Sequence, residues 1–353
     1  MFDVQKFRTQ AAFFAAAIIF AAGSAAARDF TYAGWGGGLQ EAQREAYLKP
    51  FAAATKEAFK EDVYLGGMAK FEAMKASKDV VWDVVNVEAG VLQAGCDDGT
   101  FLKIDFARVG TPRTGFLPGM ATDCGVGSYT YAFALAYDAD VLKEAPTSLA
   151  DFWNTQKWPG RRGLRKGPLY NLELALLAEG VAPKDVYKTL STEEGVNRAF
   201  RKLDAIKSQV VWWEAPAQTP ELLGAGTVSM VFAPNARISA AAKTGRNFKM
   251  AFKPGMTGTD FWAIVAGSPK VDAAYQFMKI AASPQAQANF SNSFAYSPTV
   301  AAAEPLITPA AKAILPIGES VAGALSLSTP EAKGFWADNA DRLTERWNAW
   351  LAR

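Results

Sequence analysis

The chain has 353 residues, half of them hydrophobic and a fifth charged, with a formal net charge of +2. This composition is typical of a globular protein with a sizeable core, and the near-neutral charge gives no reason to expect nucleic acid or an anionic membrane surface as a partner. The absence of histidine from the sequence excludes Ser-His-Asp and Cys-His nucleophiles and histidine-containing zinc sites, and it removes the commonest general base.

The first 27 residues predict export. Lys6 and Arg8 precede an apolar run over 11–22, and small residues follow over 23–27. This order is typical of a secretory signal peptide, with cleavage expected after Ala27. The apolar run is shorter than the ~20 residues that a bilayer-spanning helix needs, so an uncleaved anchor is the less favoured alternative. The mature chain is therefore expected to be soluble in the periplasm, where a protein without histidine is more typically a binding protein than an enzyme.

Cys96 and Cys124 are the two cysteines of the chain. In an oxidising compartment, an even pair most simply forms one disulfide, and two buried thiols are the alternative. Two thiols without histidine partners are a poor start for a metal site. We therefore expect a disulfide and neither a metal nor a cofactor.

Apolar strand-like runs alternate with amphipathic helical stretches along the mature chain, which predicts an α/β protein. The first unit has predicted strands over 30–33, 63–65, 80–87 and 129–137 and predicted helices over 39–59 and 68–77. The second has predicted helices over 172–179 and 193–208 and predicted strands over 210–213 and 228–232. The rest comprises a strand over 261–266, a helix over 271–282 and a C-terminal helix over 335–351, whose stripe of Phe335, Leu343, Trp347 and Trp350 is expected to pack in the core.

This order predicts two lobes. The first spans 28–137, the second spans 138–257, and the chain returns to the first over 258–353. Ligand sites of open α/β sheets lie beyond the carboxyl ends of the strands, so a cleft between the lobes is the expected binding site.

A glycine run, Gly34-Trp35-Gly36-Gly37-Gly38, follows the first predicted strand. It does not match the dinucleotide fingerprint, because Leu39 takes the place of the third glycine, and the chain has no P-loop motif. The run is better explained as a flexible turn that projects Trp35 over the cleft, where its ring can bind an alkyl chain or an ammonium group. Core packing of Trp35 is the alternative.

Four segments resemble the spermidine/putrescine-binding family of periplasmic solute-binding proteins, the receptors of ABC importers. They are FTYAGWGG at 30–37, WDVVNVEAG at 82–90, GTDFWAIVAGSPKVDAAYQFMK at 258–279 and NFSNSFAYSPTV at 289–300, which contains the family's Tyr-x-Pro segment with Tyr296. The resemblance covers essentially the whole mature chain. It implies a two-lobed periplasmic binding protein fold of type II, with a hinge and an interlobe cleft, and delivery of the ligand to a membrane permease.

The resemblance also implies site residues. Trp35 matches the family's aromatic residue after the first strand, and Asp260 aligns with the acidic residue that binds a ligand amine. Glu88 falls where polyamine binders tend to have a serine, and a solvated loop carboxylate is the alternative for it. From the residues alone, both carboxylates border apolar strands, where a buried charge is costly unless it is paired.

The sequence departs from the polyamine binders in the second lobe. The stretch 166–170 has no acidic residue for a second amine, whereas Arg237 follows the strand-like run 229–236 at a helix start. A guanidinium there can bind a carboxylate through paired hydrogen bonds, and a surface arginine is the alternative. An acid and an arginine in one cleft suit a zwitterion such as 4-aminobutyrate. Of Trp212 and Trp213, at most one is expected to line the cleft, because neighbouring strand residues point to opposite faces; Trp213 is our choice.

Several alternatives remain open at this point. A polyamine is the second choice of ligand, and a secreted hydrolase using Glu88 with Asp260 is a remote one. Iron binding would need a tyrosine cluster, but core packing explains Tyr129 and Tyr131 better. A chemoreceptor is a possible partner besides the permease, and a monomer is the default state.

Overall fold

The computed structural model describes residues 28–318 and 321–353. The expected signal peptide and its cleavage site lie outside them. No helix in these ranges is long and apolar enough to cross a membrane. The strands found there are β1 (Phe30–Gly34), β2 (Phe59–Val63), β3 (Val84–Glu88), β4 (Val126–Asp138), β5 (Arg162–Arg165), β6 (Val210–Trp213), β7 (Met230–Pro234), β8 (Phe248–Ile264) and β9 (Leu325–Ser326).

The helices lie between and after these strands. They are α1 (Gly37–Gln43), α2 (Lys49–Thr55), α3 (Ala69–Ser77), α4 (Ala89–Asp97), α5 (Phe106–Val109), α6 (Asn171–Ala178), α7 (Val186–Leu190), α8 (Glu193–Asp204), α9 (Gln218–Gly224), α10 (Asn235–Ala242), α11 (Val271–Ala281), α12 (Pro284–Ser293), α13 (Pro309–Lys312) and α14 (Pro330–Leu351). A π-helical turn, η1 (Arg44–Leu48), joins α1 to α2, and short 3-10 turns occupy several connections.

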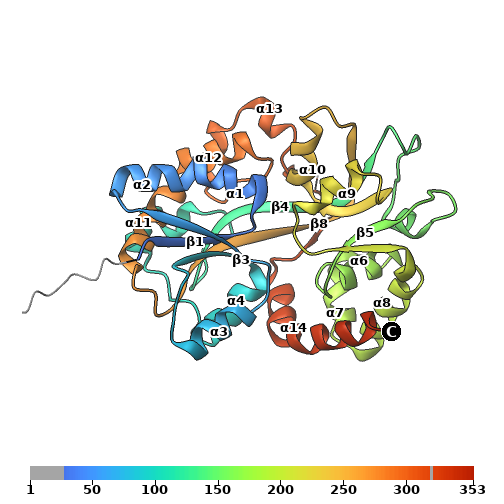
Figure 1. The fold of residues 1–353 in the computed structure, drawn as a ribbon, viewed down its shortest axis with the longest axis horizontal. Coiled ribbons are helices and arrows are strands. Elements are labelled where there is room, and N and C mark those ends of the chain that lie inside the picture. The colour runs from blue at the N-terminus through green and yellow to red at the C-terminus, as the bar shows by residue number, and fades with distance from the viewer. Residues whose placement is uncertain (1–27, 319–320) are drawn as a thin grey trace, which may run out of the picture.

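The strands form one sheet in the order β2-β1-β3-β8-β4-β7-β5-β6, with β9 beside β8. Parallel strands β2, β1 and β3 make one lobe, and parallel strands β7, β5 and β6 make the other. The long antiparallel strands β4 and β8 run through the middle and connect the two (Figure 1). The structure thus has the two-lobed α/β fold that the sequence predicts.

Helices cover both faces of each lobe (Figure 1). Helix α8 illustrates why they form: Thr192 caps its first turn, and Val196, Ala199, Phe200 and Leu203 bury one face at helical spacing. Helix α14 packs against α4 of the first lobe and α7 of the second. Its predicted stripe is buried, so the core-packing interpretation of that stripe is confirmed.

Three predicted elements were misplaced. The helix predicted over 39–59 ends at Thr55, and β2 occupies Phe59–Val63 instead of 63–65, because its half-polar sequence FKEDV lacks the apolar character used to find strands. The strand predicted over 261–266 begins as early as Phe248. Asp260 therefore lies inside a long strand rather than before its start.

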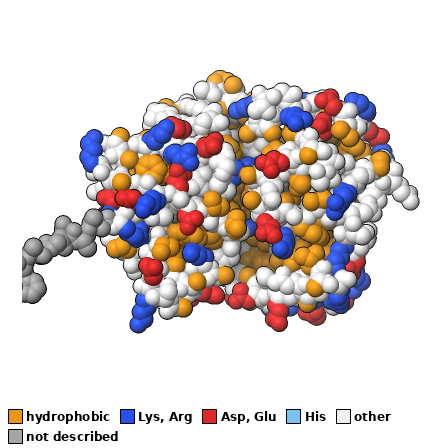
Figure 2. Space-filling model, in the orientation of Figure 1, with side chains coloured by type: hydrophobic (Ala, Val, Ile, Leu, Met, Phe, Trp, Pro, Cys, Tyr) orange, Lys and Arg blue, Asp and Glu red, His pale blue; other side chains and the backbone are white. Residues whose placement is uncertain are grey.

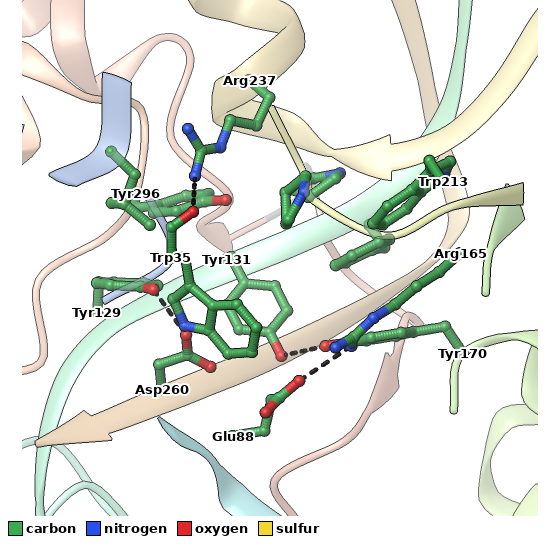
Figure 3. Close-up of a pocket in the computed structure, with 14 residues that line it drawn as sticks. Trp35, Glu88, Tyr129, Tyr131, Arg165, Tyr170, Trp213, Arg237, Asp260 and Tyr296 are labelled. Atoms are coloured by element: carbon green, nitrogen blue, oxygen red, sulfur yellow. Dashed lines mark hydrogen bonds and ion pairs between the residues drawn. The ribbon is translucent and has the colours of Figure 1, made fainter. Parts of the chain in front are cut away.

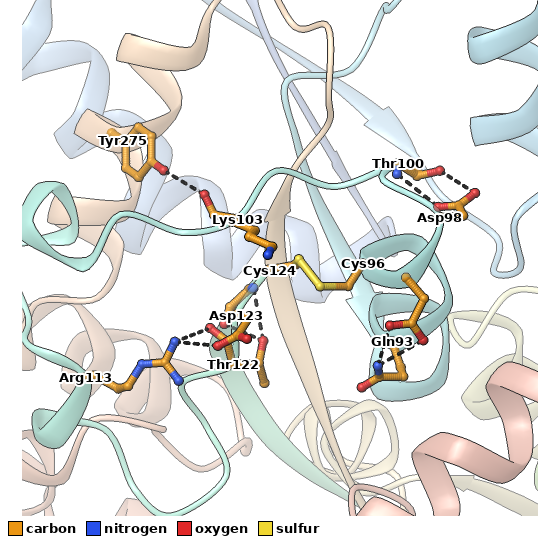
Figure 4. The surroundings of a disulfide bond; sticks show 12 residues. Gln93, Cys96, Asp98, Thr100, Lys103, Arg113, Thr122, Asp123, Cys124 and Tyr275 are labelled. Carbon is orange, nitrogen blue, oxygen red and sulfur yellow. Dashed lines mark hydrogen bonds and ion pairs between the residues drawn. A yellow bond between two sulfur atoms is a disulfide. The ribbon is translucent and has the colours of Figure 1, made fainter.

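Cys96 and Cys124 form the expected disulfide, with their Cα atoms 5.6 Å apart. The bond joins the end of α4 to the segment that leads into β4 (Figure 4). Nearby, Arg113 forms an ion pair with Asp123, the neighbour of Cys124. The disulfide thus fixes one helix of the first lobe to a strand that crosses to the second.

Candidate functional site

A buried cavity lies between the lobes where the carboxyl ends of the strands meet. All six predicted ligand-binding residues line it: Trp35, Glu88, Trp213, Arg237, Asp260 and Tyr296. The cavity, called here the inner chamber, has a volume of about 30 Å³, roughly the share of one liquid water molecule. Side chains of the two lobes contact each other around it, as the ion pair of Arg165 with Glu88 shows.

Strand register explains why the two predicted carboxylates meet. Asp260 of β8 is paired with Glu88 of β3 on one side and with Tyr129 of β4 on the other. Residues opposite each other on neighbouring strands project from the same face of the sheet. The three side chains therefore form one row at the chamber wall (Figure 3).

Asp260 is buried and retains an unused oxygen. Its Oδ2 atom accepts a hydrogen bond of 2.6 Å from the Tyr129 hydroxyl, whereas Oδ1 has no partner. Burial and the negative charge of Glu88 raise the pKa of Asp260 to about 7, against the effect of the Tyr129 hydroxyl and of the nearby Trp35 indole. A cationic group in the chamber would supply the missing partner and favour the ionised form.

Glu88 is not the solvated loop carboxylate that the alternative interpretation assumed. It is buried at the start of α4, and its Oε1 atom accepts a hydrogen bond of 2.9 Å from Arg165 Nη1. Because Glu88 belongs to the first lobe and Arg165 to the second, this ion pair bridges the chamber (Figure 3). Its charge is thus largely neutralised by a residue that sequence reasoning missed.

Arg237 is not a surface arginine either, since its side chain is buried at the start of α10. Its Nη2 atom donates to the carbonyl oxygens of Trp35, at 3.3 Å, and of Gly36, at 3.0 Å. The glycine run makes this approach possible: Gly37 has φ +58°, and a Cβ atom there would lie 2.8 Å from Arg237 Nη1. Burial lowers the pKa of Arg237 from its ordinary value, and Nε has no hydrogen-bond partner.

Aromatic rings form the rest of the wall. Tyr296 stacks on Tyr129 with ring centroids 4.7 Å apart, and Trp35 lies between Arg237 and Asp260 (Figure 3). Trp213 lines the chamber, whereas Trp212 packs against Trp347 on the other face, so the prediction that at most one of the pair would line it is confirmed. Tyr129 and Tyr131, which we expected to be plain core residues, are buried but also line the chamber.

Several of the buried polar atoms that lack a hydrogen-bond partner in the described residues lie at this site. Five of the six predicted residues carry a buried nitrogen or oxygen without a hydrogen bond, namely Trp35 Nε1, Glu88 Oε2, Trp213 Nε1, Arg237 Nε and Asp260 Oδ1. Buried polar groups are nearly always hydrogen-bonded, so such a group of exceptions indicates a place where a polar ligand completes the network.

Sequence reasoning assigned two residues of the chamber wall, Tyr129 and Tyr131, to the core. It missed six others: Leu39, Phe133, Arg165, Tyr170, Pro216 and Pro234. For Arg165, the available signal was its place at the end of a short strand, before the turn Gly167-Pro168. Among the described residues, no group of acidic, cysteine or histidine side chains is arranged to hold a metal ion.

Comparison with known proteins agrees with this geometry. Residues 46–316 match the family model described as bacterial extracellular solute-binding protein. The chain is 42% identical over 334 residues to the gamma-aminobutyric acid-binding protein of Pseudomonas aeruginosa, covering 94% of both chains. The binding protein MotA of A. tumefaciens B6, solved in complex with glucopine, is 33% identical with a TM-score of 0.85, covering 92% of this chain and all of that one. The Atu4243 GABA receptor is 30% identical with a TM-score of 0.80, covering 92% and 98%.

These matches confirm the resemblance to solute-binding proteins and the two-lobed fold. Such proteins are substrate-binding components of ABC importers rather than enzymes: they bind a small ligand outside the cytoplasm, in the periplasm, and deliver it to a membrane permease. The family match covers most of the chain, and the relative from Pseudomonas covers nearly all of it. The chain therefore belongs to the bacterial extracellular solute-binding protein family.

Proposed function

We propose that this receptor binds an amino acid whose amino and carboxyl groups are far apart, with 4-aminobutyrate as the ligand. In this proposal Arg237 binds the carboxylate, Asp260 binds the ammonium group, and Trp35, Trp213 and Tyr296 enclose the chain between them. Glu88, whose charge is balanced by Arg165, offers its unpartnered Oε2 atom as a hydrogen-bond acceptor at the ammonium end.

One observation carries the choice of a zwitterion. The chamber has two acidic and two basic side chains, but Glu88 and Arg165 already neutralise each other. One net cation, Arg237, and one net anion, Asp260, remain. A diamine would need two free carboxylates and would meet an uncompensated guanidinium, which is costly in a buried site.

The relatives support the same ligand. The protein from Pseudomonas is a gamma-aminobutyric acid-binding protein, and the Atu4243 structure is a GABA receptor. MotA was solved with glucopine, so the same fold also accommodates a different ligand. The zwitterion assignment for this chain therefore rests on the charges of its own chamber together with these names.

Binding is proposed to proceed by hinge closure. The ligand enters while the lobes are apart, and closure then forms charge-assisted hydrogen bonds in a dehydrated chamber. The expected hinge lies where β4 and β8 pass between the lobes, near 257/258 on β8; on β4 it lies before Phe133–Tyr137, which pairs with β7 of the second lobe, and so ahead of the predicted boundary at 137/138. Cleavage after Ala27 is part of the proposal; Arg28 would then be the first residue, and its guanidinium binds Asp83 through two contacts of 2.7 Å. The mature protein is proposed to act as a monomer without a nucleic-acid partner.

The test is calorimetric titration of protein that has been unfolded, freed of carried-over ligand and refolded. We expect 4-aminobutyrate to bind with 1:1 stoichiometry, and putrescine and spermidine to bind far more weakly. Arg237→Ala should weaken binding of 4-aminobutyrate by roughly 30- to 4,000-fold, as is usual when one partner of a buried charge pair is removed.

Arg246→Ala is the matched control, because Arg246 is exposed and does not line the chamber. Its affinity should equal that of the unchanged protein. Tight binding of the diamines alone, or an Arg237→Ala protein with undiminished affinity, would contradict the proposal.

A further inference from the structure

A second and larger cavity adjoins the inner chamber. This outer cavity has a volume of about 420 Å³, against about 30 Å³ for the inner chamber. It lies between α3 and α4 of the first lobe, the β5–α6 turn of the second lobe, and α14. The face of the molecule in Figure 2 is hollowed between α4 and α6, and hydrophobic side chains gather there.

Four side chains separate the two cavities and line both of them: Glu88, Tyr131, Arg165 and Tyr170. They form two pairs, the ion pair of Arg165 with Glu88 and a hydrogen bond of 2.9 Å between the hydroxyls of Tyr131 and Tyr170. A ligand that reached both cavities would have to part these two pairs. The partition that the four side chains form also contains Glu88 Oε2, a buried oxygen without a hydrogen-bond partner.

The partition is built with unusual backbone. Tyr170 has φ +71°, a conformation that side-chain-bearing residues rarely adopt, and it stacks on Phe133 at 4.2 Å. Gly66 has φ +100°, and a Cβ atom there would lie 2.7 Å from Arg165 Nη2. Strained positions of this kind are concentrated at ligand sites, where the surroundings hold them in place.

The partition borders the amine end of the chamber. Glu88 is paired with Asp260 across the sheet, whereas Arg237 lies on the opposite side of the Trp35 ring (Figure 3). An amino acid held as proposed above therefore points its nitrogen toward the outer cavity and its carboxylate away from it.

We propose that the outer cavity is a second subsite, which takes an apolar substituent on the ligand's amino nitrogen. The ligand class is then N-substituted ω-amino acids, with the zwitterionic head in the inner chamber and the substituent between the apolar side chains of Leu65, Met68, Leu169, Leu327 and Trp336. A secondary ammonium still offers two protons, one for Asp260 and one for the free oxygen of Glu88. This inference rests on the proposed function for the orientation of the head group.

The experiment compares 4-aminobutyrate with N-benzyl-4-aminobutyrate by calorimetry. Ala340 lies on α14, lines the outer cavity and does not line the inner chamber. Ala340→Trp should fill the subsite. The affinity for the N-benzyl compound should fall by at least about tenfold, and the affinity for 4-aminobutyrate should stay unchanged, because only the substituent loses apolar contact. Ala349→Trp, on an exposed part of the same helix, is the control and should change neither affinity. Thr344→Trp, at the same cavity, replaces Ala340→Trp if that variant does not fold.

The outcomes separate this inference from the proposed function. If the protein binds 4-aminobutyrate but not the N-benzyl compound, or if Ala340→Trp weakens both alike, the subsite is refuted and the proposed function stands. Binding of the N-benzyl compound alone, lost in Ala340→Trp, would support the subsite and refute 4-aminobutyrate as the ligand. Binding of neither compound would refute both.

Discussion

At the scale of single residues, the site depends on two carboxylates with different roles. Glu88 and Asp260 lie side by side across β3 and β8, but only Glu88 has an arginine partner. Burial and the nearby negative charge of Glu88 raise the pKa of Asp260, which has no arginine partner of its own. The structure thus leaves Asp260 able to exchange a proton for a ligand cation near neutral pH.

This difference predicts a pH dependence of binding. Because the pKa of Asp260 in the free protein is about 7, an ammonium ligand must displace a proton below that pH. The affinity for 4-aminobutyrate should therefore be highest above pH 8 and should fall as the pH drops through 7. The expected decrease between pH 8 and pH 5.5 is roughly 30-fold. The ligand's own groups do not titrate in this window.

Calorimetry at a series of pH values measures the effect, and proton uptake or release appears as a dependence of the heat on the buffer. Asp260→Asn is the control, since an amide has no such proton: it should bind weakly at every pH. A flat profile for the unchanged protein would mean that Asp260 is ionised before the ligand arrives.

At the scale of elements, the disulfide fixes the end of α4 to the start of β4, outside both cavities. It closes a loop with a sequence separation of 28 residues, for which the loop-entropy model gives a stabilisation of about 3–4 kcal/mol. Cys96→Ser/Cys124→Ser should therefore lower the free energy of unfolding by about that amount and leave the affinity for 4-aminobutyrate unchanged, because neither cysteine lines a cavity.

Urea unfolding followed by tryptophan fluorescence measures the change, with the oxidised and dithiothreitol-treated proteins side by side. Reductant should reproduce the effect in the unchanged protein and do nothing to the double variant. Equal urea midpoints for the oxidised protein, the dithiothreitol-treated protein and the double variant would show that the disulfide contributes little to stability. A large loss of affinity would show that α4 positions Glu88 only when it is held by the bond.

Local patterns predicted the elements that bury an apolar face. The strand at 210–213 and the helix at 271–282 came out within one residue, since the first is a short run of β-branched and aromatic residues and the second has apolar residues at helical spacing. The first half of β8 was missed, because Phe248–Gly255 mixes charged, apolar and glycine residues and pairs with β4, more than 100 residues away in sequence. Pairing over such a distance leaves no local periodicity.

The site was predictable where a residue follows an apolar strand. Trp35, Glu88 and Arg237 were found because each comes directly after such a run, at the sheet edge where ligands bind. Arg165 was not found, because its importance comes from Glu88, 77 residues away and in the other lobe. The neutralisation of Glu88, on which the choice of ligand rests, is a property of the closed structure.

At the scale of the whole molecule, two sets of polar contacts join the lobes around the inner chamber. The Arg165–Glu88 pair and the bonds from Arg237 to the carbonyls of Trp35 and Gly36 connect side chains or backbone of opposite lobes. A ligand whose carboxylate binds Arg237 would replace these hydrogen bonds with charge-assisted ones. The equilibrium between open and closed lobes then shifts toward the closed form by the difference in free energy between the two sets of bonds.

Removing the interlobe ion pair should therefore open the ligand-free protein. Glu88→Gln/Arg165→Met changes both partners, so that no uncompensated charge is left buried. Small-angle X-ray scattering of this variant should give a larger radius of gyration than the unchanged protein without ligand. Saturating 4-aminobutyrate should reduce the difference, because Arg237 and Asp260 still hold the two lobes through the ligand.

Arg108→Met/Asp272→Asn is the control. It removes an exposed ion pair within the first lobe, and its scattering curve should match that of the unchanged protein. Identical curves for both variants without ligand would mean that apolar contacts, not the ion pair, keep the empty lobes together.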